Sequence, residues 1–223
     1  MQENIDLIEL YRKAVKNLIS TEYFDIQPTH PLMLSVPQNY DKKIKVMLFG
    51  QETNGWQDDL GYDPEKTMER YDRFWIEKKS NFSRVGPFLQ VLNSFQKMLG
   101  TDEFSCIWNN IIKIGKKDDS GLPPEYIINW QKEWFNVIAE EVRILKPDLI
   151  IFFTGPDYDK YIEKALGQFT TSQVLGRNVR EIAKLNFSDH NEILAFRTYH
   201  PRYLRLKGLE KEFLEYFKQQ AVS

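Results

Sequence analysis

Cysteine and long apolar runs are both scarce in this sequence. Cys106 is the only cysteine among 223 residues, so one chain forms no internal disulfide and holds no iron–sulfur cluster through cysteines. A reducing compartment is therefore expected, with Cys106 as a buried apolar side chain. No apolar run approaches the ~20 residues of a membrane-spanning helix, and the N-terminal residues lack the apolar core of a secretory signal. We expect a cytoplasmic protein that does not enter a membrane.

The sequence also lacks an excess of charge of either sign. Lys and Arg number 30 and Asp and Glu 32, a formal net charge of −2. This is not the basic balance of a protein that coats nucleic acid, although a local basic cluster can still bind a few phosphates. The chain has no internal repeat and no Gly/Ser-rich linker. We expect one domain over residues 1–223, in which residues 1–40 form an N-terminal helix and an irregular lead-in.

Strand-like and helix-like segments alternate along the chain. Apolar, β-rich runs predict strands at residues 44–50, 106–114, 149–154 and 193–198. Apolar residues at helical spacing predict helices within residues 8–19, 64–77, 86–99, 124–145, 157–166 and 209–219. The segment 170–187 fits an edge strand or a hairpin. This alternation predicts an α/β fold with three layers, α/β/α, and a mostly parallel central sheet.

Polar residues follow the predicted strands, and ligands of open parallel sheets bind beyond the carboxyl ends of the strands. Residues 50–56, Gly-Gln-Glu-Thr-Asn-Gly-Trp, place a carboxylate and two amides between two glycines. These groups suit the orientation of a water molecule or a polar ring; a plain turn and solvated loop is the alternative. Asn110 is an amide in an otherwise apolar strand and needs hydrogen-bond partners there. It could pair with a base edge or serve the structure alone.

The other two strand ends differ in character. Residues 154–158, Thr-Gly-Pro-Asp-Tyr, indicate the start of a helix. Its free N–H groups could meet an anion, and an ordinary strand-to-helix turn is the alternative. In residues 197–205, His200 follows a strand directly and is flanked by three arginines and two tyrosines. Cationic and aromatic side chains together suit a nucleic-acid backbone and its bases.

In this order, the four strand ends resemble the motifs of the uracil-DNA glycosylase superfamily. Val46-Met-Leu-Phe-Gly-Gln-Glu52 is similar to its first motif, a strand that ends in Gly-x-Asp or Gly-x-Asn. Asn110-Ile-Ile-Lys113 is similar to the Asn-x-Val-Lys form of its strand-end Asn, and residues 146–155 to its central strand and turn. Thr198-Tyr-His-Pro-Arg-Tyr-Leu204 resembles its closing His-Pro-Ser-x-Leu motif. The resemblance spans roughly residues 44–206.

The resemblance implies a uracil-DNA-glycosylase-like fold and a catalytic activity. The reaction would be hydrolysis of the N-glycosidic bond that joins uracil or another damaged base to DNA. Glu52 would position the attacking water, and His200 would stabilise the negative charge of the leaving base. The chemistry needs only water, so no metal and no cofactor is expected.

The resemblance also implies binding residues and a partner. The base-binding candidates, which include a strand-end amide that reads the extruded base and an aromatic platform beneath it, are Gln51, Asn110, Phe82 and Trp56. The candidates for contacts with DNA, one of them an apolar wedge that fills the vacated stack, are Lys113, Arg202, Leu204 and Arg205. The expected partner is single- or double-stranded DNA with the base extruded, bound by a monomer.

Three positions depart from the family motifs. Glu52 stands where the family has Asp or Asn, and one extra methylene moves the carboxylate by about an ångström, which can cost ~10²-fold in rate. Thr53 replaces the usual Pro, and Arg202 replaces Ser. With one cysteine, the chain resembles a branch without the iron–sulfur cluster. Two alternatives stay open: an inactive member that binds nucleobases or nucleic acid, and an unrelated α/β enzyme or nucleotide-binding protein that shares only the crevice.

Overall fold

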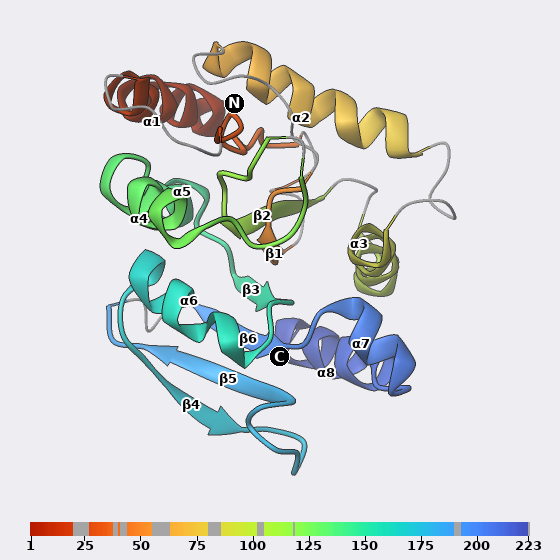
Figure 1. The fold of residues 1–223 in the computed structure, drawn as a ribbon. Coiled ribbons are helices and arrows are strands. Elements are labelled where there is room, and N and C mark those ends of the chain that lie inside the picture. The colour runs from red at the N-terminus through yellow and green to blue at the C-terminus, as the bar shows by residue number, and fades with distance from the viewer. Residues whose placement is uncertain are drawn as a thin grey trace.

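The computed structural model describes most of the chain (Figure 1). The described residues are 1–19, 27–37, 40, 44–54, 63–79, 86–101, 105–117, 119–189 and 193–222. None of the helices in these ranges combines the length and the apolar character needed to span a bilayer.

One six-stranded sheet forms the centre of the fold, in the order β2-β1-β3-β6-β5-β4. Its strands are β1 (Val46–Glu52), β2 (Cys106–Ile112), β3 (Leu149–Phe152), β4 (Phe169–Gln173), β5 (Ile182–Phe187) and β6 (Leu194–Thr198). β2, β1, β3 and β6 run parallel, whereas β5 and β4 form an antiparallel hairpin at one edge. The predicted mostly parallel sheet is confirmed, and the segment 170–187 takes the hairpin alternative.

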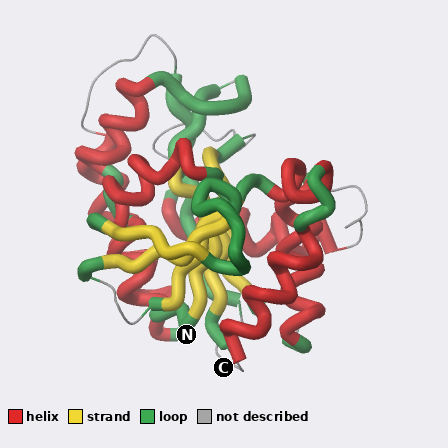
Figure 2. The backbone as a smooth tube through the Cα atoms, turned by 90° about the horizontal axis from the view of Figure 1, so that it is seen from below, coloured by secondary structure: helices red, strands yellow, loops and turns green. Residues whose placement is uncertain are grey.

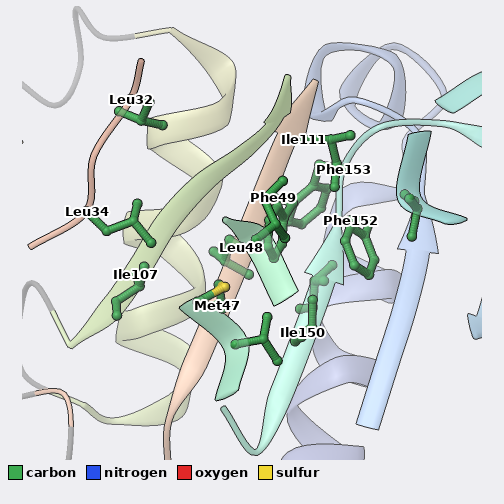
Figure 3. Close-up of a cluster of buried hydrophobic side chains, with 14 of the residues drawn as sticks. Leu32, Leu34, Met47, Leu48, Phe49, Ile107, Ile111, Ile150, Phe152 and Phe153 are labelled. Carbon is green, nitrogen blue, oxygen red and sulfur yellow. The ribbon is translucent and has the colours of Figure 1, made fainter. Parts of the chain in front are cut away.

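The strands β1 and β3 lie in the middle of the sheet and are buried on both faces. Val46 pairs with Leu149 and Phe49 with Phe152, and the rings of Phe49 and Phe152 stack with centroids 4.9 Å apart. Figure 3 shows these rings and Met47 within a cluster of apolar side chains from β1, β2 and β3. A parallel strand with both faces covered buries every side chain. This burial explains why an unbroken apolar run predicted each strand.

Helices cover both faces of the sheet, in three layers (Figure 1). One face carries α1 (Gln2–Ile19), α4 (Glu125–Trp134), α5 (Ile138–Leu145) and α6 (Asp159–Leu166), and the other carries α3 (Pro87–Leu99), α7 (Pro201–Leu206) and α8 (Glu210–Val222). The helix α2 (Pro64–Lys79) packs on α1, and a short 3₁₀ turn, η2 (Pro156–Tyr158), precedes α6. Figure 2 shows the strands between the two groups of helices.

Several predicted boundaries differ from the structure, and two of these differences have a clear structural reason. The expected helix over residues 124–145 is two helices, α4 and α5, because the backbone of Phe135 leaves the helical region at φ −135° and ψ 41°. Its ring is buried and stacks on Tyr11. Apolar spacing continues across this break, so the sequence alone indicates one helix. The strand β1 also continues to Glu52, beyond the predicted start of the loop, because Glu52 stays in register with Ile112 of β2.

Candidate active site

A pocket of about 670 Å³ lies at the carboxyl ends of β1 and β2, between α2, α3 and the start of α7. Its lining includes four residues that the sequence singled out, Gln51, Glu52, Asn110 and His200. The structure therefore brings these side chains, which are distant along the chain, around one cavity. The two predicted platform residues, Trp56 and Phe82, lie outside the described residues.

The position of Asn110 depends on the glycine beside it in the sheet. Gly50 of β1 pairs with Asn110 of β2, and a Cβ atom added to Gly50 would come within 2.4 Å of Asn110 Oδ1. That distance is far below van der Waals contact, so any other residue at position 50 would displace the amide. Glycine here lets the Asn110 side chain lie directly over the end of β1.

The Asn110 amide keeps hydrogen-bonding capacity for a ligand. Its Nδ2 donates to Thr53 Oγ1 at 3.1 Å, and its Oδ1 accepts from Trp108 Nε1 at 3.2 Å. A side-chain amide has two N–H donors and two acceptor lone pairs. Counting partners within the described ranges, one N–H and one lone pair are left over. Asn110 can therefore offer a donor and an acceptor side by side, which matches the edge of a pyrimidine ring.

The carboxylate of Glu52 is held by two neighbours. Tyr158 donates from its hydroxyl to Oε2 at 2.5 Å, and Asn54 donates from Nδ2 to Oε1 at 3.4 Å. The N–H of Gly121 in turn donates to Asn54 Oδ1 at 2.7 Å. Burial and the hydrogen bond to Glu52 raise the pKa of Tyr158, so the phenol keeps its proton and acts as the donor. These contacts fix a carboxylate at the end of β1.

The third strand end leads into η2 and α6 and contacts the site through Tyr158. Gly155 has a φ of +77°, a conformation that favours glycine, and its N–H donates to Thr198 O at 2.9 Å;. Gln51 Nε2 donates to Thr154 O at 2.8 Å, which ties the end of β1 to this turn. The segment leads through η2 into α6, as both alternatives predict, and it acts on the pocket through the hydrogen bond from Tyr158 to Glu52.

His200 caps the N-terminus of α7 and is fixed in one tautomer. Its Nδ1 accepts a hydrogen bond from the Arg202 N–H at 3.2 Å. Burial lowers the pKa of His200; Glu52 opposes this effect, and Arg202 adds to it. The ring is therefore neutral near pH 7, and because Nδ1 accepts, the proton lies on Nε2. His200 supplies the pocket with one oriented, neutral N–H donor.

Three aromatic rings form one wall of the pocket. Trp108 of β2 lies with its ring centroid 5.3 Å from that of Phe74 and 6.4 Å from that of Phe88. The Tyr71 hydroxyl bonds both the N–H and the C=O of Trp108, which holds α2 along the β2 edge. Sequence reasoning missed this wall, because apolar spacing predicts a helix within residues 86–99 but does not show whether Phe88 faces the core or a pocket.

Two arginines also line the pocket, and sequence reasoning missed both. Arg70 and Arg73 lie on α2, one helical turn apart. Their spacing of three residues, which puts them on one face of a predicted helix, was the available signal. The spacing does not show which strand ends this face of the helix packs against.

Two predicted contacts with DNA are wrong. Lys113 is fully buried, and its Nζ donates to Glu141 Oε1 at 2.7 Å and to Asn109 Oδ1 at 2.8 Å, so it cannot reach a phosphate. Leu204 has 0% of its surface exposed because it points from α7 into the core. Two residues later, Leu206 is 77% exposed and has the surface position that was expected for Leu204.

The other two predicted contacts with DNA remain on the surface. Arg202 is exposed in the first turn of α7, directly after His200. Arg205 is also exposed, and its guanidinium group bonds Glu210 and Gln90. Of these two, Arg202 is the one whose charge acts on His200, and it lowers the pKa of the imidazole.

The chemistry available to the pocket is that of a carboxylate, amides, an imidazole and guanidinium groups. Among the described residues, no cluster of three or more His, Cys, Asp or Glu could hold a metal ion. Burial raises the pKa of Cys106 to about 12, which leaves its thiol protonated inside the sheet. Neither protein-family models nor curated protein sequences give a match to this chain.

Proposed function

We propose that this chain is a monofunctional DNA glycosylase that hydrolyses the N-glycosidic bond of uracil or another damaged base. The observation that carries the proposal is that Glu52, Asn110 and His200, from three different strand ends, line one pocket. The resemblance of these strand ends to the uracil-DNA glycosylase superfamily supports the same function. The three-layer fold with a mostly parallel sheet is compatible with it.

Base recognition falls to Asn110 and the aromatic wall. A base inside a duplex is stacked and paired, so it must be extruded before it can enter such a pocket. Its ring would stack on the face of Phe88 or Trp108, an interaction worth ~1–3 kcal/mol. The free N–H and lone pair of Asn110 would then bind complementary groups on the base edge. Gln51 lies beside them and is held through its amide nitrogen to Thr154.

Bond cleavage falls to His200 and Glu52. As the glycosidic bond breaks, its electron pair moves onto the base, and the sugar carbon becomes cation-like. The Nε2–H of His200 would donate to the base oxygen on which negative charge develops. The carboxylate of Glu52 would face the sugar, balance its positive charge and orient a water. The water oxygen bonds to the sugar carbon, and its proton leaves to the carboxylate.

The longer side chain of Glu52 has a compensating contact. Relative to Asp, its extra methylene adds one rotatable bond, which by itself would allow the carboxylate to adopt more positions. The hydrogen bond from Tyr158 restrains Oε2, and Asn54 restrains Oε1. The substitution of Glu for Asp is therefore paired with a phenol that fixes the carboxylate.

The DNA itself would lie across α7. Arg202 is exposed beside His200, where it can meet a phosphate. Leu206 replaces Leu204 in our assignment of the apolar side chain that enters the base stack, because Leu206 is the exposed one of the two;.

A uracil-containing single-stranded oligonucleotide, treated with alkali after incubation with the pure protein, tests the activity. We expect strand scission with the wild type and a loss of at least ~10²-fold with His200→Ala, the scale of one oxyanion-stabilising donor. Arg143→Gln, a change on the exposed face of α5, is the matched control. No scission at enzyme excess, on uracil or on other damaged bases, would refute the proposal.

A second function, binding of a nucleobase without chemistry, is favoured by one observation. Both oxygens of Glu52 already accept hydrogen bonds from the protein, which limits their freedom to take a proton from water. This alternative predicts that uracil-containing DNA quenches the fluorescence of Trp108 while no base is released. Turnover of the same oligonucleotide would exclude it.

A further inference from the structure

Two tyrosines beside His200, Tyr199 and Tyr203, have no part in the proposed reaction. The sequence places them among cationic side chains, a combination that suits nucleic acid. Their rings are in contact, with centroids 4.4 Å apart and planes at 42° to each other. Both are half-buried, so part of each ring reaches the surface. Tyr199 follows β6 and precedes His200 of the pocket lining, so the pair adjoins the pocket.

Tyr199 packs on the turn that follows β3. A Cβ atom added to Gly155 would lie 3.2 Å from Tyr199 Cδ1, so the glycine lets this ring approach the backbone closely. The Gly155 N–H donates to Thr198 O at 2.9 Å, which holds the turn against the end of β6. Tyr199 is therefore fixed by contacts with this turn and with Tyr203, and its ring supports that of Tyr203.

Tyr203 lies on α7 and has a cation as its second neighbour. Lys207 follows four residues later, which places it on the same side of the helix, and its Nζ lies 5.8 Å from the centre of the Tyr203 ring. Lys207 is exposed, and the attraction between an exposed cation and a ring is weak. A nucleobase, which covers more of the ring than an ammonium group does, can therefore take this position while Lys207 turns toward a phosphate.

The charged groups around the tyrosine pair form a local pattern. Arg202 directly precedes Tyr203 and Lys207 comes one turn after it, and both cations are exposed. Four other arginines near the ends of β5, β6 and α7 are paired with acids: Arg177 with Glu181 and Glu212, Arg180 with Asp157, Arg197 with Asp159, and Arg205 with Glu210. A ring between two exposed cations suits one base and its phosphates, whereas the balanced charges around it do not form a long cationic surface.

We propose that Tyr203, supported by Tyr199, stacks an unpaired base next to the extruded one, and that single-stranded DNA is therefore the substrate. The inference rests on the proposed function, which puts the extruded base in the pocket beside His200. In a single strand the neighbouring base can turn its flat face to Tyr203, whereas in a duplex that base is paired and stacked. Stacking on an aromatic ring accepts any base. Arg202 and Lys207 bind the phosphates of the stacked nucleotide.

Two single strands that differ only beside the uracil test this stacking. Both carry 2′-fluorinated deoxyuridine, whose glycosidic bond resists hydrolysis, and in one strand abasic sites replace the two neighbouring nucleotides and keep their phosphates. By fluorescence anisotropy we expect the wild type to bind the intact strand at least ~5-fold more tightly, the lower end of the effect of one base–aromatic stack. Tyr203→Ala should bind both strands equally, whereas Tyr203→Phe keeps the ring and should keep the preference. Tyr126→Ala, at an exposed tyrosine of α4 on the other face of the sheet, is the matched control.

The duplex and the salt dependence extend the experiment. Tyr203→Ala should leave the affinity for a duplex with the same uracil unchanged, because the neighbouring bases of a duplex are not available to Tyr203. Lys207→Gln should lower the slope of log K against log salt for the single strand by ~0.7, the contribution of one phosphate contact. An equal loss of affinity for single strand and duplex in Tyr203→Ala contradicts the assignment of single-stranded DNA.

The stacking proposal is overturned if the wild type binds the intact and the abasic strands equally, a result that depends on no variant. It is also overturned if Tyr203→Ala keeps the preference, or if Tyr203→Phe loses it as Tyr203→Ala does, since the hydroxyl and not the ring would then make the contact. Failure of the proposed function would look different. In that case no base is released from any strand, while a strand without uracil still loses affinity, in a Tyr203-dependent way, when its bases are removed.

Discussion

Asn109 and Asn110 are neighbours on β2, yet they belong to two different kinds of polar cluster. Successive side chains of a strand point to opposite faces of the sheet. Asn109 therefore enters a closed network under α1 and α5, in which its Nδ2 donates to Glu141 Oε2 at 2.8 Å. Asn110 points the other way, into the open pocket. Two identical side chains thus take opposite roles because of a single step along the chain.

The closed network uses the polar groups that it buries. Glu141 accepts from Lys113 at 2.7 Å and from the Tyr11 hydroxyl at 2.6 Å, and the same hydroxyl accepts the Leu34 N–H at 3.0 Å. Burial lowers the pKa of Lys113 while Glu141 raises it, and burial with Glu141 raises that of Tyr11. Each charge is paired and bonded, as buried charges must be. This network joins α1, β2 and α5.

The open pocket, by contrast, contains hydrogen-bond donors and acceptors that are available to a ligand. Asn110 retains a donor and an acceptor, and His200 presents an N–H that its own helix does not use. The two clusters differ in access: Asn109, Lys113 and Glu141 are buried in the core, whereas Asn110 and His200 line a pocket that a ligand can enter.

The largest expected effect comes from breaking the closed network. Glu141→Ala leaves Lys113 buried without a counter-charge, and we expect the free energy of unfolding to fall by about 3–5 kcal/mol. Urea-induced unfolding, followed by circular dichroism, measures it. Glu140→Ala is the matched control, because Glu140 is exposed and pairs with Arg143 on the surface; it should cost less than about 1 kcal/mol. Equal losses in the two variants would contradict the comparison.

A paired substitution tests the comparison directly. Asn109→Ala should lower the free energy of unfolding by about 1–3 kcal/mol, since it leaves buried partners unsatisfied, with little change in the affinity for deoxyuridine. Asn110→Ala should cost less stability, because the Thr53 hydroxyl keeps its bond to Ile112 O, but should weaken deoxyuridine binding by ~10-fold. Chemical unfolding and calorimetry together measure both. If the two variants lose stability and affinity in the same proportion, the distinction between the clusters is wrong.

A smaller effect is expected where the pocket depends on a positioning residue. Tyr158→Phe removes the donor to Glu52 Oε2 but keeps the ring that packs on Tyr161. We expect kcat for base release to fall by up to ~10-fold, with KM nearly unchanged, because Tyr158 acts on the carboxylate and not on the base. Tyr161→Phe, one turn further, is the control. A rise in KM with unaltered kcat would place Tyr158 in ligand binding instead.

The sequence predicts the frame of this molecule better than its site. Apolar runs in the sequence predict the middle strands. The polar residues that follow these strands predict the position of the pocket, because parallel strands end at one edge of the sheet. Alternation alone also predicts the helices that cover the sheet. What the sequence of a strand does not show is which of its two faces helices will cover and which will line a pocket. Lys113 in the motif-like Asn-Ile-Ile-Lys run turns into the core for this reason, and its partner Glu141 is 28 residues away.

The functional side chains that helices contribute could not be predicted for a related reason. Leu204 and Leu206 differ only in which side of α7 they occupy, and the sequence showed no helix there. Arg70 and Arg73 reach the pocket only because α2 packs along the β2 edge, a contact made by Tyr71 and Trp108. Such a contact between elements that are distant in sequence depends on tertiary packing, which local spacing does not encode.

The smallest expected effect is a shift in pH dependence, set by His200. Burial holds its pKa below the ordinary value of 6.5, so the ring stays neutral as the pH falls through 6.5 and is protonated only at lower pH. Protonation places a hydrogen on Nδ1, which then repels the Arg202 N–H and breaks the cap. Base release should therefore stay constant down through pH 6.5 and decline only below it. Since the folded state prefers neutral His200, its contribution to stability is complete above 6.5 and is lost toward the lower pKa.

The Arg202→Gln variant sharpens this prediction. Arg202 lowers the pKa of His200 and Glu52 raises it, so removal of the guanidinium group should move the acid limb of the kcat/KM profile to higher pH. The backbone N–H that caps Nδ1 is unchanged by the substitution, and the tautomer is therefore preserved. A limb that moves to lower pH, or one centred above 6.5 in the wild type, would show that another group controls the reaction. The direction of this small shift tests whether the open pocket works through one neutral imidazole.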